Sequence, residues 1–133
     1  MVLSLQPVDY RDLDLVVSSG SIGLVLYRAA LGPNFERIVG ASGKLGQYLR
    51  CGLPVICLAL PGFRSLMNKY HCGECIEELH EIPLAVKRIL ENYSEYSQNA
   101  TRCYEQSFEF GTHFKPVLQR IHEMCPEYMN PVS

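Results

Sequence analysis

The chain has 133 residues, of which 47% are hydrophobic and 20% are charged, a composition typical of one globular domain rather than of a disordered chain. Its net charge of −2 gives no sign of the basic surface that nucleic-acid-binding proteins carry. No apolar run approaches the roughly 20 residues that cross a bilayer, and residues 1–7 lack the basic start of a signal peptide. We therefore expect a cytoplasmic protein whose six cysteines are reduced thiols.

The first part of the chain predicts one helix and then one strand. Residues 9–19 carry apolar side chains at the i, i+3, i+4 spacing of a helix, although a strand over residues 13–17 is an alternative. The uninterrupted apolar run over residues 22–27 is typical of a buried strand. Residues 28–41 show no periodicity, which predicts a loop of a length that often serves function.

The next segment carries the start and the end of a helix and leads directly into a strand. Ser42 is a good N-cap, because its hydroxyl can accept from the free N–H groups of the first turn. Gly52 stands where a glycine ends a helix in the left-handed conformation, and Pro54 prevents the helix from resuming. The run Val-Ile-Cys-Leu that completes a strand over residues 54–58 has no polar alternation, so both of its faces should be covered.

The rest of the chain predicts one further strand among helices. Apolar residues recur at helical spacing in the last third of the chain, which indicates amphipathic helices. Ser94 and Thr112 are the residues expected to cap the last two helices. The expected elements are a helix over residues 63–70, a strand over 73–76, a helix beginning near Pro83, two further helices and a tail over 123–133.

Three strands separated by helices predict a single α/β domain over residues 1–133. Its parallel sheet of about three strands would have helices on both faces, followed by a helical C-terminus. Ligands of such sheets bind outside the carboxyl ends of the strands, often at helix N-termini.

One alternative site is a Cys-x-x-Cys pair formed by Cys72 and Cys75, with His71 and His80 beside it. A structural zinc site needs four ligands, and the sequence supplies no second close pair. Redox motifs of this spacing open a helix, whereas Cys75 enters the predicted strand. We therefore expect neither a metal nor a redox cofactor.

The segment over residues 42–56 reads Ser-Gly-Lys-Leu-Gly-Gln-Tyr-Leu-Arg-Cys-Gly-Leu-Pro-Val-Ile. It resembles the donor-binding segment of GT-B glycosyltransferases, the enzymes that use nucleotide sugars. The strand over residues 22–27 and the segment over 93–100 are similar to the elements that flank this segment in the family. The resemblance covers about residues 10–122. It implies a partial Rossmann-like fold, namely the second half of a C-terminal donor-binding domain without the N-terminal acceptor domain.

The resemblance also implies an activity, the transfer of a hexosyl group from a nucleotide-diphosphate sugar to a saccharide or lipid-linked acceptor in polysaccharide biosynthesis. No metal is required, and the general base would belong to the absent half, so the chain alone should be inactive. A non-catalytic subunit of a split glycosyltransferase and an inactive gene remnant that at most binds a nucleotide sugar are the alternatives.

The implied partners are the nucleotide sugar and either a companion acceptor-domain chain or a second copy of this chain. Such a chain, or alternatively the tail of this chain, would cover the edge of the strand over residues 22–27, which is left exposed where an earlier strand is missing. The implied location is the cytoplasm, free or at the inner face of the membrane.

The resemblance places the donor site at the loop over residues 28–41 and at the start of the following helix. A helix N-terminus offers free N–H donors and about half a unit of positive charge to a diphosphate. Cationic side chains would add phosphate contacts there. The residues assigned to the nucleotide sugar are Tyr27, Arg28, Ser42, Gly43, Lys44, Leu45 and Gln47.

Several of these residues also have a simpler explanation. Ser42 could serve only as an N-cap, and Arg28 and Lys44 could be solvated cations. Tyr27 could be an aromatic residue at the rim of the core, and Gly43 could serve the packing of the helix.

The segment departs from the family at one pair of positions. Gln47 stands where many retaining members carry a glutamate that binds the ribose, although an amide can still hydrogen-bond a diol. The second expected glutamate is replaced by Val39, and Glu36 is out of register. Retention or inversion of the anomeric configuration therefore stays undecided.

Overall fold

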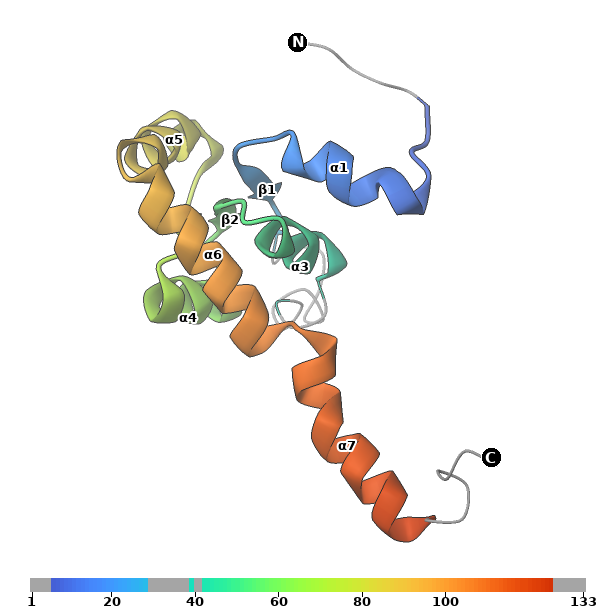
Figure 1. Ribbon diagram of the computed structural model, residues 1–133. Coiled ribbons are helices and arrows are strands. Elements are labelled where there is room, and N and C mark those ends of the chain that lie inside the picture. The colour runs from blue at the N-terminus through green and yellow to red at the C-terminus, as the bar shows by residue number, and fades with distance from the viewer. Residues whose placement is uncertain (1–5, 29–38, 40–41, 126–133) are drawn as a thin grey trace.

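The computed structural model describes residues 6–28, 39 and 42–125. These residues form an α/β fold, in which an open three-stranded parallel sheet is flanked by helices and followed by a long C-terminal helix (Figure 1). The fold class expected from the sequence is therefore confirmed. Most of the expected loop over residues 28–41, with Glu36, and the end of the expected tail lie outside the described residues.

Three short strands make up the sheet. β1 (Gly23–Val25), β2 (Val55–Leu58) and β3 (Gly73–Ile76) are parallel and lie in the order β1-β2-β3. In this register Cys57 of β2 lies opposite Cys75 of β3. β2 is the central strand, and β1 is shorter than the run of residues 22–27 predicted.

Helices occupy most of the remaining described residues. The helix expected over residues 9–19 is present, and the alternative of a strand over 13–17 is wrong. The last helix continues through Met124, so the first residues of the expected tail are helical. The helices are η1 (Tyr10–Asp12), α1 (Leu13–Ser18), α3 (Gly43–Arg50), α4 (Pro61–Tyr70), η4 (Leu79–Glu81), α5 (Ile82–Glu91), α6 (Tyr93–Ser107) and α7 (Phe110–Met124).

The start and the end of α3 follow the predicted signals. Ser42 is the N-cap, and its hydroxyl oxygen accepts from the backbone N–H of Leu45 at 3.2 Å. Gly52 has a φ of 71°, in the left-handed region that favours glycine at the end of a helix. This tight ending delivers the chain into β2.

The caps predicted for the last two helices are wrong. α6 begins after Asn92, so Ser94 lies inside its first turn. α7 begins after Glu109, whose carboxylate accepts from the backbone N–H groups of Gly111 and Thr112. A carboxylate satisfies these donors as a hydroxyl would, and its charge favours the positive end of the helix.

Two apolar clusters cover opposite faces of the sheet, because successive strand residues point to opposite sides. On one face α3, α4 and α6 enclose Val25 and Cys57 in the larger cluster. On the other face α5 places Ile89 against Ile56 and Ile76. The expectation of helices on both faces is therefore confirmed.

The outer side of β1 is less well covered. Within the described residues β1 pairs only with β2, and α5 contacts β2 and β3. Leu24 of β1 is 42% exposed. Whether another chain covers the edge of β1 stays a prediction.

α7 extends from the end of α6 away from the sheet (Figure 1) and buries none of its residues. Several of its large apolar side chains are exposed. Even so, no helix among the described residues combines the length and the hydropathy that a membrane span requires. The exposed apolar residues of α7 are Phe110, Val117, Leu118, Ile121 and Met124.

The contact between β3 and β2 can be tested at Gly73. A Cβ at this position would lie 2.0 Å from the backbone oxygen of Val55, so Gly73→Ala must push the two strands apart. We expect the free energy of unfolding to fall by about 2 kcal/mol, measured by urea denaturation. Gly43→Ala is the control, because a Cβ there meets nothing within 4 Å. Equal effects of the two substitutions would contradict this packing.

Candidate strand-end ligand site

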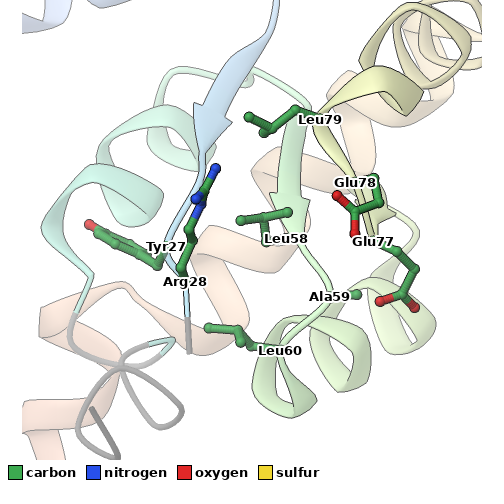
Figure 2. A pocket seen from close by; sticks show the side chains of 8 residues that line it. All are labelled: Tyr27, Arg28, Leu58, Ala59, Leu60, Glu77, Glu78 and Leu79. Carbon is green, nitrogen blue, oxygen red and sulfur yellow. The ribbon is translucent and has the colours of Figure 1, made fainter. Parts of the chain in front are cut away.

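A cavity of about 350 Å³ opens at the carboxyl ends of the strands (Figure 2). Its lining residues come from the end of β2 and from the segments that follow the three strands. This edge is where open parallel sheets bind their ligands. The lining residues are Tyr27, Arg28, Leu58, Ala59, Leu60, Glu77, Glu78 and Leu79.

The charged side chains of this cavity lie on opposite sides of it. Figure 2 shows Arg28 on the β1 side, and Glu77 and Glu78 on the β3 side. The Glu77 carboxylate forms an ion pair with Arg64 of α4, and the Glu78 side chain accepts from the backbone of Glu81 in a capping box. Among the described residues Arg28 makes no ion pair, and its side chain is exposed. The cavity thus has the Arg28 guanidinium on one side, and on the other two carboxylates that already have partners within the protein.

Tyr27 connects this cavity to the N-terminus of α3. Its hydroxyl oxygen lies 3.4 Å from Oγ of Ser42, and its ring stacks on Phe63 with a centroid separation of 6.3 Å. Ser42 is only 4% exposed, and its hydroxyl also accepts from the N–H of Leu45. The structure thus brings Tyr27 and Ser42 together and gives Ser42 the role of an N-cap.

The other expected site residues of α3 differ widely in exposure. Leu45 is fully buried in the larger apolar cluster, so only its backbone could take part in a site. Gly43 and Lys44 are exposed in the first turn.

A second hollow, of about 380 Å³, lies between α1 and α3. Gly43, Lys44 and Gln47 line this hollow rather than the strand-end cavity. The structure therefore divides the expected site residues between two hollows, and the contact between Tyr27 and Ser42 joins the two groups. The other residues that line the second hollow are Tyr10, Leu13, Val17 and Tyr48.

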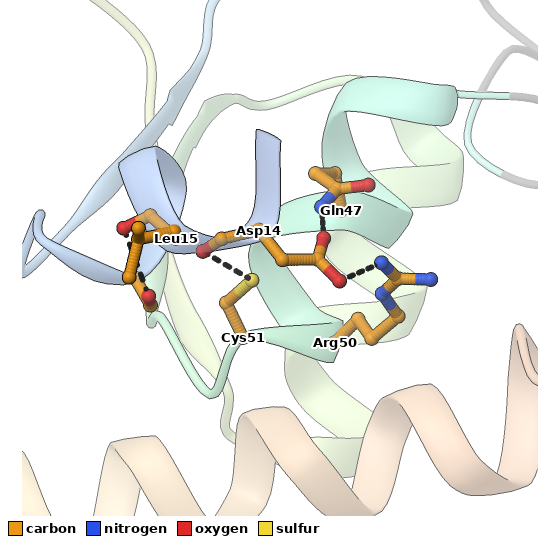
Figure 3. Close-up of polar contacts among 6 residues, drawn as sticks. Asp14, Leu15, Gln47, Arg50 and Cys51 are labelled. Carbon is orange, nitrogen blue, oxygen red and sulfur yellow. Dashed lines mark hydrogen bonds and ion pairs between the residues drawn. The ribbon is translucent and has the colours of Figure 1, made fainter. Parts of the chain in front are cut away.

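Gln47 takes part in a network that ties α3 to α1 (Figure 3). Its amide and the Arg50 guanidinium both donate to the Asp14 carboxylate. The hydrogen bond from Arg50, and after it that from Gln47, holds the pKa of Asp14 below its ordinary value of 3.8. The amide nitrogen of Gln47 is thus engaged within the protein, and its contact with a ribose stays a prediction.

The sequence reasoning did not find the cavity residues that follow β2 and β3. The sequence does contain a signal for them, because parallel strands bring the residues at their carboxyl ends to one edge of the sheet. The residues directly after residues 54–58 and 73–76, the second and third predicted strands, were therefore candidates. The residues missed are Leu58, Ala59, Leu60, Glu77, Glu78 and Leu79.

The two thiols of the Cys-x-x-Cys pair have different neighbours. In the part of the chain that the structure describes, no group of three His, Cys, Asp or Glu side chains could hold a metal ion. Cys72 is fully buried and lies 3.8 Å from the sulfur of Met67. Cys75 faces Cys57 instead, at 3.5 Å between the two Sγ atoms.

Comparison with known families gives a match over most of the chain. Residues 8–121 match the family described as glucosyltransferase 3-like, C-terminal domain. The chain belongs to this family. This glucosyltransferase 3-like domain has no significant match among the curated proteins or among the solved structures. The matched range includes all three strands, and the relationship to glycosyltransferases expected from the sequence is shown at the level of the family.

The N-cap at the entrance of α3 can be tested by substitution. Ser42→Ala removes the acceptor of the Leu45 N–H, and we expect a loss of about 1 kcal/mol in the free energy of unfolding. Ser94→Ala is the control, because Ser94 is exposed within the first turn of α6 and is not its N-cap. Urea denaturation of both variants measures the difference. An equal loss of stability for Ser94→Ala would contradict the stabilising role of the Ser42 N-cap.

Proposed function

We propose that this domain is the donor-binding half of a GT-B glycosyltransferase and that it holds a nucleotide-diphosphate sugar at the strand-end cavity. The observation that carries the proposal is the 3.4 Å contact between the hydroxyl oxygens of Tyr27 and Ser42. It sets the N-terminus of α3 beside a cavity at the carboxyl ends of parallel strands. Membership of a glucosyltransferase 3-like family supports the same conclusion.

The diphosphate would lie between Arg28 and the first turn of α3. The first N–H groups of a helix have no partner within the helix and carry partial positive charge. Gly43 is exposed and has no side chain, so a phosphate oxygen can approach the backbone closely. Arg28 adds a planar cation that can bind two phosphate oxygens at once. Lys44 lines the hollow between α1 and α3 rather than the strand-end cavity, and its charge adds to the positive potential of the first turn.

The carboxylates on the β3 side of the cavity orient the donor. The carboxylates of Glu77 and Glu78 have partners in Arg64 and in the Glu81 backbone, but a carboxylate has further lone pairs that can accept hydrogen bonds from hydroxyl groups. The hydroxyl groups of the donor would therefore face the β3 side, and its diphosphate the β1 side. With its phosphates held by cations, the donor loses its diphosphate more readily as the anomeric carbon gains positive charge.

The domain would supply only part of the enzyme. Transfer of a hexosyl group, glucose in the first place given the family's description, needs an acceptor site and a general base from an N-terminal domain or companion chain. This partner would cover the edge of β1, where Leu24 is exposed. We propose that the bound donor needs no metal, because side chains and helix N–H groups provide the positive charge.

Binding can be tested by calorimetry with uridine and guanosine diphosphates and their glucose esters. Arg28→Ala removes a charge-assisted contact and should weaken binding of the preferred ligand about tenfold. Arg120→Ala is the control, because Arg120 lies on α7 and pairs with Glu123 at 3.3 Å. Equal affinities for Arg28→Ala and the unsubstituted chain, or no binding of any of these ligands at millimolar concentration, would refute the proposal.

A further inference from the structure

Two cysteine side chains face each other across β2 and β3. Cys57 and Cys75 are register partners in these parallel strands, and their Sγ atoms lie 3.5 Å apart as free thiols. Neighbouring strands are about 4.8 Å apart, within the roughly 4.4–6.8 Å that separates the Cα atoms of disulfide-bonded cysteines. A bond between these sulfurs therefore requires small side-chain movements and no change of register.

The two thiols differ in exposure and acidity. Cys57 is fully buried, whereas Cys75 is partly exposed on the outer strand β3. The hydrogen bond from Cys57, helped by the charge of Arg64, lowers the pKa of Cys75. The same contact and burial raise the pKa of Cys57. A partly exposed thiol of lowered pKa beside a second thiol is the arrangement that responds to oxidants.

We propose that Cys75 and Cys57 form an oxidisable dithiol, in which a small peroxide oxidises Cys75 and Cys57 then closes a reversible disulfide between β3 and β2. In the first step the Cys75 thiolate attacks a peroxide oxygen. An S–O bond forms, the O–O bond breaks, and the released hydroxide takes up a proton to leave as water. The sulfur is oxidised to a sulfenic acid and the peroxide is reduced.

In the second step the sulfur of Cys57 attacks the sulfur of Cys75. The S–S bond forms, the S–O bond breaks, and the leaving hydroxide takes the proton of Cys57 and departs as water. A thiol reductant reverses the bond by thiol–disulfide exchange. Cys57 directly precedes Leu58, and Cys75 lies two residues before Glu77. The disulfide would therefore join two strands close to the points where each contributes a residue to the lining of the strand-end cavity.

The other described cysteines lack this combination of features. Cys72 and Cys103 contact each other, but both are fully buried, so a peroxide has no exposed thiol to attack. Cys51 lies against the backbone oxygen of Asp14. Cys125 is exposed at the end of α7, and it provides an internal measure of simple thiol oxidation.

Peptide mapping of the full chain tests the proposal. The chain is treated with hydrogen peroxide, its remaining thiols are blocked with iodoacetamide, and it is digested with trypsin without reduction. The tryptic peptides over residues 51–64 and 70–87 each carry two cysteines, so fragment-ion spectra must assign the link. We expect Cys57 linked to Cys75, and loss of the link on treatment with dithiothreitol.

Three variants separate the two steps. Cys57→Ser removes the second thiol and keeps a hydrogen-bond donor beside Cys75, so dimedone should label a sulfenic acid at Cys75, which mere packing of two thiols would not produce. Cys75→Ala should abolish both the label and the link, and Cys125→Ala should leave the link unchanged.

The proposal is overturned if Cys75 stays unmodified at a peroxide concentration that oxidises Cys125, or if the link joins any other pair. The mapping of the unsubstituted chain does not depend on the folding of a variant. None of these oxidation experiments uses a nucleotide sugar, so their outcome does not depend on the proposed function.

Discussion

The burial of β2 between two partner strands and two layers of helices is the constraint on which the rest of the structure depends. Val55, Ile56 and Cys57 are all fully buried, and β2 pairs in parallel with both β1 and β3. A strand that is apolar on both faces can be stable only if helices cover both sides. Because all three strands are parallel, their carboxyl ends also meet at one edge. The core packing of the domain and the position of its cavity thus have one cause.

The sequence predicts this central part well, because its signals are local and strong. Ser42, Gly52 and Pro54 mark the ends of α3, and the apolar run after them is β2. The caps of α6 and α7 were misplaced because several polar residues near each start could act as a cap, and the choice between them depends on packing. Glu109, Thr112 and their neighbours offer several possible caps at the start of α7, and the Glu109 carboxylate satisfies the N–H groups that a threonine hydroxyl could also accept from.

The candidate site was predictable only in part, because it depends on how α3 sits against the sheet. Tyr27 and Arg28 could be placed from the end of a single strand. Gln47 turns toward α1, where Asp14 accepts from it, and no local pattern reveals a contact between residues so far apart in the sequence. Glu77 and Glu78 resemble ordinary solvated acids until β3 is set beside β2. Their position sets two carboxylates across the cavity from Arg28.

The most direct measurement is a map of amide chemical shifts in the full chain on titration with uridine diphosphate and its glucose ester. If the strand-end cavity is the donor site, the largest shifts will fall on Tyr27, Arg28 and the segments over residues 58–60 and 77–79. The first turn of α3 should shift with them. Shifts confined to Tyr10, Leu13 and Val17, in the hollow between α1 and α3, would contradict a donor site at the strand ends.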